Sequence, residues 1–164
     1  EESLRDWRWW GMRFYFVDRV TELEPGKNIR GFKNVSMSEP YFTTHFPRFP
    51  VLPGVIIIEA MAQLAGLLIE VSPQGGAEKR KALLSIVDRV KFKRVVRPGD
   101  RLDLTAELVV IDEDGARADV AARVGEELVA MTRLTFVLMP VPREFADVLE
   151  QERAALLYAL QVRS

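Results

Sequence analysis

The sequence predicts an α+β domain in which a curved antiparallel sheet wraps around one long buried helix. The run GVIIIEAMAQLAGLLIEV, residues 54–71, is too long for a typical strand and apolar on nearly every side, which indicates a helix buried all round. Residues 101–138 alternate apolar and polar side chains and are interrupted only by short turns. Turns this short leave no room for crossover helices, so these strands pair antiparallel. A sheet that buries one face against a single helix is α+β.

Two strands are expected before the helix. We place them at residues 14–20 and 28–36, joined by the turn-forming segment EPGK at 24–27. Residues 39–53 are predicted to be a non-helical loop that is stiff, because each of its prolines fixes φ and removes a backbone donor. Pro53-Gly54 then opens the helix, since proline is tolerated at a helix start.

Four strands and a second helix are expected after the surface loop at residues 72–81. The predicted strands are residues 82–96, 101–111, 117–124 and 127–138. The tail from Arg143 to Val162 is predicted to be helical and to pack against the domain or another subunit. Its apolar stripe is Phe145, Val148, Leu149, Leu156 and Leu160. We therefore divide the chain into a single domain, residues 1–140, and a helical extension, residues 141–164.

Composition excludes several classes of function. The net charge of -1 provides no basic field for nucleic acid. The lack of cysteine excludes disulfides and thiolate metal sites, and a single histidine excludes a multi-histidine metal site. The longest apolar run is short for a membrane span and contains Glu59 and Gln63. The start of the sequence lacks a secretory pattern, so we expect a cytoplasmic protein. We also expect Trp7, Trp9 and Trp10 to pack onto the domain.

Glu59 is a carboxylate in the first turns of the apolar helix. Burying a charged carboxylate is costly unless it is paired, so the surroundings favour the neutral acid, which can serve as a general acid. Gln63 lies one turn further along the same helix face and can hold Glu59 in one orientation. The residues alone leave open an alternative, in which Glu59 is a structural acid that caps or pairs with a basic side chain.

His45 lies in the proline-rich loop that leads into this helix. A lone loop histidine is most often a polar surface residue, but imidazole is also the natural base near neutral pH. The first N–H groups of the helix, at Gly54 and Val55, lack intrahelical partners and can stabilise a developing oxyanion. A base, an acid and an oxyanion site suit proton abstraction α to a carbonyl with loss of a β leaving group, and a thioester is a fitting substrate.

The segment KNVSMSEPYFTTHFPRFPVLPGVIIIEAMAQLAG, residues 33–66, resembles the signature of the β-hydroxyacyl-acyl-carrier-protein dehydratases of the FabZ type. FVDRV at 16–20 and FKRVVRPGD at 92–100 are similar to two further family segments. The resemblance covers roughly residues 14–138. It implies a hotdog fold that is at least dimeric, and assemblies of three dimers are common in the family.

The resemblance also implies an activity: elimination of water from a (3R)-3-hydroxyacyl thioester on acyl carrier protein, giving a trans-2-enoyl thioester. His45 and Glu59 match the catalytic base and acid, which in the family come from different subunits. Gly54 matches the residue whose N–H binds the thioester carbonyl, and Val55 and Gln63 are further candidates for substrate binding. Glutamate at the acid position is similar to the dehydratase type. No cofactor or metal is implied.

Some residues depart from the family pattern. Thr44 and Arg48 stand where glycines are usual, and Arg48 can narrow the pocket, contact a carrier-arm phosphate or face solvent. Since acyl carrier proteins are acidic, the candidate docking residues are the basic side chains Lys79, Arg80, Lys81, Lys91, Lys93 and Arg94. Two alternatives to the dehydratase are a hotdog thioesterase and a non-catalytic acyl-binding partner subunit.

Overall fold

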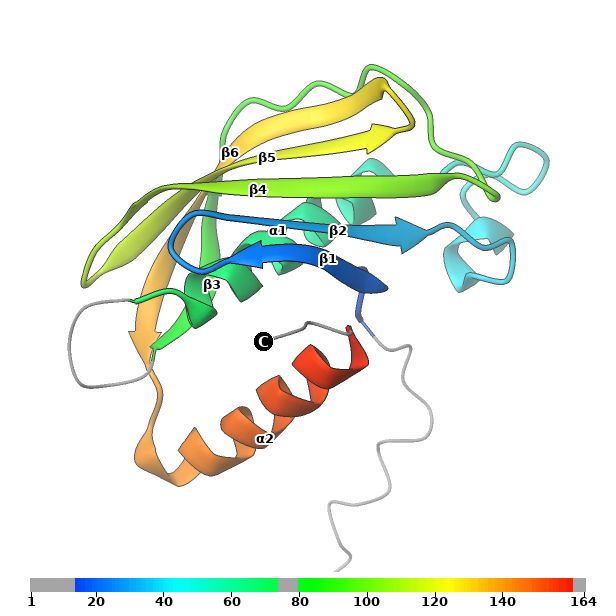
Figure 1. Ribbon diagram of the computed structural model, residues 1–164. Coiled ribbons are helices and arrows are strands. Elements are labelled where there is room, and N and C mark those ends of the chain that lie inside the picture. Colours follow the sequence, from blue (N-terminus) through cyan, green and yellow to red (C-terminus); the bar gives the residue numbers. More distant parts are fainter. Residues whose placement is uncertain (1–13, 74–79, 161–164) are drawn as a thin grey trace, which may run out of the picture.

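The structure, a computed structural model, describes residues 14–73 and 80–160. In this part of the chain six strands form one antiparallel sheet, in the order β1-β2-β4-β5-β6-β3, that curves around the long helix α1 (Figure 1). The predicted α+β architecture is therefore confirmed. The strands are β1 (Arg19–Glu24), β2 (Asn28–Asn34), β3 (Arg80–Val87), β4 (Arg101–Ile111), β5 (Gly115–Val124) and β6 (Glu127–Pro140); the helices are η2 (Pro40–Thr43, a 3-10 turn), α1 (Gly54–Val71) and α2 (Arg143–Ala159).

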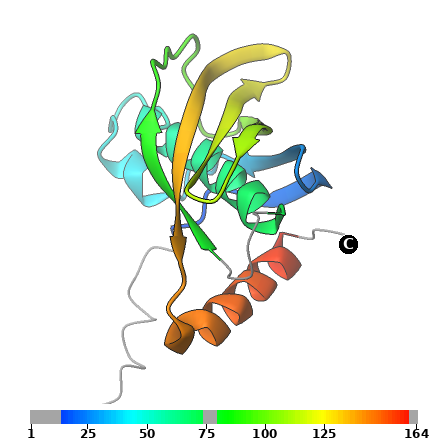
Figure 2. The same cartoon turned by 90° about the vertical axis from the view of Figure 1, so that its left-hand side faces the viewer.

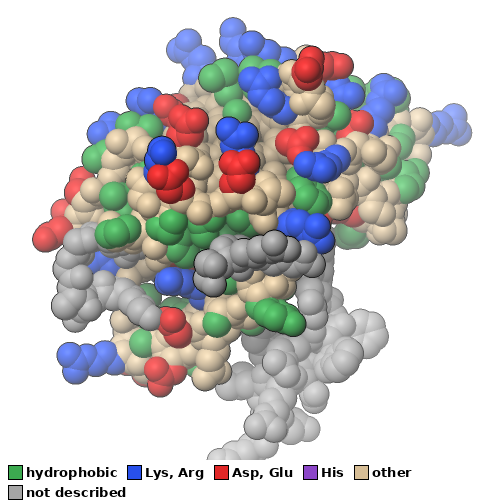
Figure 3. Space-filling view, in the orientation of Figure 1, with side chains coloured by type: hydrophobic (Ala, Val, Ile, Leu, Met, Phe, Trp, Pro, Cys, Tyr) green, Lys and Arg blue, Asp and Glu red, His purple; other side chains and the backbone are tan. Residues whose placement is uncertain are grey.

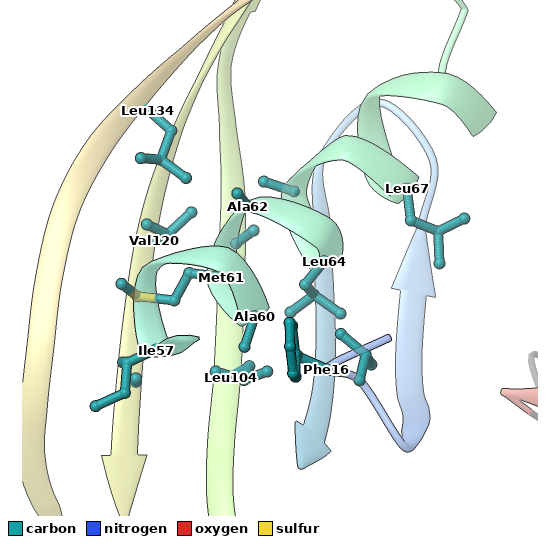
Figure 4. Close-up of a cluster of buried hydrophobic side chains, with 14 of the residues drawn as sticks. Phe16, Ile57, Ala60, Met61, Ala62, Leu64, Leu67, Leu104, Val120 and Leu134 are labelled. Carbon is teal, nitrogen blue, oxygen red and sulfur yellow. The ribbon is translucent and has the colours of Figure 1, made fainter. Parts of the chain in front are cut away.

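Helix α1 has the bounds that its apolar pattern predicts, and it forms the centre of the core. Ala60, Met61, Leu64 and Leu68 are fully buried, and Met61 and Ile57 point toward the strands (Figure 4). The expectation of burial all round is wrong for two parts of the helix. Its face along Glu59, Gln63, Gly66 and Glu70 is only half-buried, and Val55 in the first turn is 72% exposed. The sheet curves around one side of α1 and leaves this face uncovered.

Helix α1 is long and apolar enough to cross a membrane by length and composition. The core helix of a soluble protein meets the same criteria, and α1 packs its apolar side chains against the sheet. On the outer face of the sheet, seen in Figure 3, Lys and Arg side chains are interspersed with Asp and Glu. This surface is that of a solvated domain.

The strands next to the loops depart most from prediction. β1 starts at Arg19, not at residue 14, because Phe14 and Phe16 use backbone groups to hydrogen-bond the Gln63 side chain and not a neighbouring strand. β3 ends at Val87, not at residue 96. Beyond it only isolated bonds to β6 remain, from Asp88 N–H to the Arg133 carbonyl and from Lys93 N–H to the Val129 carbonyl. The carbonyl of Val96 instead accepts a hydrogen bond from Leu52 N–H at 2.8 Å. This bond ties the segment to the loop before α1.

Helix α2 lies outside the curved sheet, on the side of α1 that the strands leave open (Figures 1 and 2). Of its predicted stripe, Leu149, Leu156 and Leu160 face inward, whereas Phe145 and Val148 are more than half exposed, which the stripe did not predict. The end of α2 is held by a 3.1 Å hydrogen bond from Val20 N–H to the Leu160 carbonyl. The Trp7–Trp10 region and Lys79 lie outside the described residues.

Candidate active site

Glu59 lies at one end of a cavity of about 310 Å³ between α1 and α2. The α1 wall includes Gln63, Gly66 and Glu70, each a turn or so further along the same helix face. Most other lining side chains are apolar, so the carboxyl group of Glu59 faces a pocket large enough for a small organic ligand. Within the described residues Glu59 makes no ion pair, and its hydrogen-bond partner is the Gln63 amide. These contacts do not fit the alternative of a structural acid paired with a base.

Gln63 holds Glu59 in one orientation. Its Nε2 donates to Glu59 Oε1 at 3.0 Å and to the Phe14 carbonyl at 2.8 Å, while its Oε1 accepts from Phe16 N–H at 2.8 Å. An N–H can only donate and a carbonyl can only accept, so the backbone fixes which end of the amide faces Glu59. Glu59 Oε1 is thereby an acceptor, and within the described residues Oε2 makes no hydrogen bond.

The His45 ring is held by a hydrogen bond and by stacking on a neighbouring ring. Its Nδ1 lies 2.9 Å from the Val51 carbonyl, and its ring stacks on Phe46 at 4.3 Å between centroids. Because a carbonyl oxygen only accepts, Nδ1 carries the proton in the neutral ring, and Nε2 keeps a free lone pair. The fold therefore leaves Nε2 available to take a proton from a substrate.

The loop that carries His45 is anchored by a buried polar cluster: Lys33, Glu39 and Tyr41. Lys33 Nζ lies 2.9 Å from Glu39 Oε1, with side chains only 5% and 17% exposed. The Tyr41 hydroxyl donates to Glu39, and burial followed by this contact raises the pKa of Tyr41. The Tyr41 carbonyl in turn accepts from the backbone N–H of His45 at 2.9 Å. The cluster thus connects the end of β2 to the backbone of the base.

The N-terminus of α1 has the two free donors that the sequence predicts. Within the described residues, the first α1 turn bonds to the Pro53 carbonyl through the N–H groups of Ile56 and Ile57, and no bond from Gly54 or Val55 N–H is present. The ring of Phe92 covers Gly54 so closely that a Cβ there would lie 2.8 Å from it. Phe92 is a site residue that sequence analysis missed, since only the folded chain brings residues 54 and 92 together.

Base and acid do not line the same pocket within one chain. The cavity beside Glu59 includes Gln63 but neither His45 nor Gly54. Arg48 does not line it either; it lies exposed in the tight turn closed by hydrogen bonds between Phe46 and Phe49. Thr44 Oγ1 donates to the Tyr41 carbonyl at 3.3 Å and so belongs to the loop's own hydrogen bonding. Within one chain, Glu59 and His45 therefore lie in separate places.

Known proteins similar to this chain point to one family. A family model for the FabA-like domain matches residues 11–133. The 3-hydroxyacyl-[acyl-carrier-protein] dehydratase FabZ of Clostridioides difficile strain 630 is 43% identical over 129 residues, which are 77% of this chain and 87% of that protein. FabZ of Bacillus subtilis strain 168 is 39% identical over 125 residues, covering 76% and 87%.

Solved structures share the fold at low identity. The dehydratase heterocomplex ApeI:P from Xenorhabdus doucetiae matches with a TM-score of 0.63 and 17% identity, covering 83% of this chain and 90% of that one. Zebra fish thioesterase superfamily member 2 matches with a TM-score of 0.58 and 17% identity, covering 73% and 79%. Fold and site together define a hotdog protein of the dehydratase and thioesterase class.

Within that class the sequence relatives decide between the two groups. This chain belongs to the FabZ family of 3-hydroxyacyl-[acyl-carrier-protein] dehydratases. The thioesterase alternative is not favoured, because the thioesterases match only in fold.

Proposed function

We propose that the protein dehydrates a (3R)-3-hydroxyacyl thioester on acyl carrier protein to the trans-2-enoyl thioester, a step of fatty acid biosynthesis. The main support for this proposal is the sequence similarity to FabZ dehydratases, over a region that includes His45 and Glu59. The orientation of Glu59 by Gln63 and of His45 by the Val51 carbonyl supports it. A non-catalytic partner subunit would not need an acid and a base that are both positioned by hydrogen bonds.

The chemical roles follow from these orientations. His45 Nε2 takes the proton from C2, and the C2–H electron pair forms the C2=C3 double bond. The C3–O bond breaks as Glu59, neutral at the start, gives its Oε2 proton to the departing hydroxyl, which leaves as water. The thioester carbonyl, which gains negative charge, accepts from Gly54 N–H at the positive end of the helix dipole, next to the free Val55 N–H. Gln63 keeps Glu59 in place.

A homodimer would complete this site by pairing the acid half-site of one chain with the base half-site of another. β3 is an edge strand of the sheet, and its Leu83, Ile86 and Val87 are 38–52% exposed. Phe46, Phe49, Val55, Phe92 and Val95, around the start of α1, are exposed as well. An apolar edge strand of this kind is suited to pairing with a second copy. The proposal includes the assembly of three such dimers.

The proposed macromolecular partner is an acyl carrier protein in the cytoplasm. Among the candidate docking residues, Lys81 is paired with Glu70 at 2.9 Å, and Arg94 is paired with Asp100 and Glu127. These pairs hold the basic side chains at defined positions and reduce their net positive field. Arg80 has a buried Nε without a hydrogen bond, so it too is only partly available to a partner. Lys91 and Lys93 lie between β3 and β4 and remain the best-placed candidates.

The test is reversible hydration of crotonyl-acyl-carrier-protein, followed as loss of the enoyl thioester absorbance. Wild-type protein should hydrate it, whereas His45→Ala and Glu59→Gln should lose turnover while keeping the wild-type melting temperature. Met131→Ala, on the exposed face of β6, serves as a control for the effects of substitution itself. An active Glu59→Gln variant would contradict the role of the acid. Hydrolysis of the thioester without hydration would favour a thioesterase.

A further inference from the structure

We propose that helix α2 forms the outer wall of the acyl-chain pocket and that its inward side chains set the length of chain the enzyme accepts. The proposal rests on the dehydratase function above. The family model ends at residue 133, and α2 begins at Arg143, so this wall is built by a part of the chain outside the matched family core.

Two helix faces with the same spacing oppose each other across the cavity. On α1 the face is Glu59, Gln63, Gly66 and Glu70; on α2 it is Leu149, Arg153, Leu156 and Leu160. In both helices the residues recur at i, i+4, i+7 and i+11, which places them along one side. A cavity of about 310 Å³ lies between the two faces. Figure 1 shows α2 beneath α1, with the two helices running in opposite directions.

The cavity extends away from the acid along α1. From Glu59 to Glu70 the helix advances eleven positions and so rises about 16 Å at 1.5 Å per residue. In the proposed reaction Glu59 touches the oxygen on C3, so the carbons beyond C3 start at this end of the cavity. The middle is lined by Ala62, Leu67, Phe136 and Leu156, which suit an alkyl chain. The occupant that fits is therefore the acyl chain of the substrate.

The far end of the cavity is polar. Glu70 pairs with Lys81 Nζ at 2.9 Å and accepts from Ala82 N–H at 3.3 Å, and its side chain is only 10% exposed. Leu149 and Arg153 of α2 lie beside this pair in both cavities that flank it. If the terminal methyl group of an acyl chain reached this point, it would have to desolvate or break the Glu70–Lys81 ion pair, which is unfavourable. The pair and the start of α2 thus mark the limit of chain length.

Helix α2 is fixed well enough to act as a wall. Leu160 is 4% exposed, and its carbonyl accepts from Val20 N–H at the start of the sheet. The opposite end of α2 follows directly from β6. Anchoring at both ends keeps Leu156 and Arg153 facing α1 while Val148 and Tyr158 face away.

The experiment measures kcat/KM for hydration of crotonyl-, decenoyl- and hexadecenoyl-acyl-carrier-protein. Gly66→Leu should fill the cavity from α1, where a first added carbon would lie 3.9 Å from Phe136 and so has room. For this variant we expect kcat/KM for the two longer substrates to fall at least tenfold relative to kcat/KM for crotonyl-acyl-carrier-protein. Leu149→Ala should open the far end and raise the relative rate for the longest chain several-fold. Val148→Ala, on the exposed face of α2, should leave the profile unchanged.

The outcomes separate the two proposals. If wild-type protein hydrates no chain, the proposed function fails. Suppose instead that wild-type protein is active, but Gly66→Leu and Leu149→Ala change kcat/KM equally for all chain lengths or leave it unchanged. Then α2 does not set the accepted chain length, and this inference is overturned. Should Gly66→Leu fail to fold, Leu156→Phe fills the same space from α2 and must give the same loss for longer chains.

Discussion

Gln63 Nε2 donates to Glu59 Oε1 across 3.0 Å, one helical turn apart on α1, and the same amide is clamped by the backbone of Phe14 and Phe16. The amide therefore links the acid to the segment that precedes β1. We therefore expect Gln63 to act through Glu59, as a positioning residue.

The first prediction concerns this link. Gln63→Met keeps the volume of the side chain but removes all three hydrogen bonds, so Glu59 loses its fixed orientation. We expect kcat for hydration to fall about 10²-fold while KM changes little, since misplacement of a catalytic group acts on the reacting geometry. A variant that raised KM alone, with kcat unchanged, would show that Gln63 binds substrate and does not position the acid. Stability should also fall, because Phe16 N–H loses its acceptor.

The second prediction concerns the sharing of the site between subunits. Mixed refolding of inactive His45→Ala with inactive Glu59→Gln should restore activity, because a heterodimer then has one site with both groups intact. With random mixing, about one quarter of wild-type activity is expected, since half the dimers are mixed and each has one working site. Refolding each variant alone is the control. Activity that stays absent from a mixture shown by mass spectrometry to contain heterodimers would place both groups in one chain.

The third prediction concerns the buried cluster behind His45. Lys33→Met leaves the buried Glu39 carboxylate without its cation, so the free energy of unfolding should fall by about 3 kcal/mol. Lys27→Met is the matched control: its pair with Glu24 is 67% and 58% exposed, and its loss should cost less than about 1 kcal/mol. Urea denaturation of both variants measures the difference. Equal losses would mean that the Lys33 pair adds no more than a surface pair.

The fourth prediction concerns pH. Asp119 and Arg133 face each other across β5 and β6, and the hydrogen bond and charge of Arg133 lower the pKa of Asp119. A folded pKa below the unfolded value, about 4, gives stability that is present above that pH and lost as pH falls through the folded pKa. The stability gap between wild type and Asp119→Asn should thus close in acid. Asp147→Asn, on exposed α2, should show a smaller dependence in thermal melts.

The sequence by itself determined the central elements and the family. α1 and β4 have the predicted bounds, and β5 and β6 lie within two residues of theirs, because each element's side-chain period records its own buried face. The signature around His45 and Glu59 identified the family, which the comparisons confirm. The roles of His45, Glu59, Gly54, Val55 and Gln63 remain predictions that the hydration assays test.

Only the tertiary structure decided what depends on distant parts of the chain. It shows that the Gln63 amide takes the hydrogen bonds that a strand at 14–18 would have made, that Phe92 covers Gly54, and that Phe145 and Val148 face solvent. It also shows a cavity between α1 and α2 that holds Glu59 but not His45. A helical period tells that a face is apolar, but which partner covers that face, and how closely, is set by packing between segments far apart in sequence.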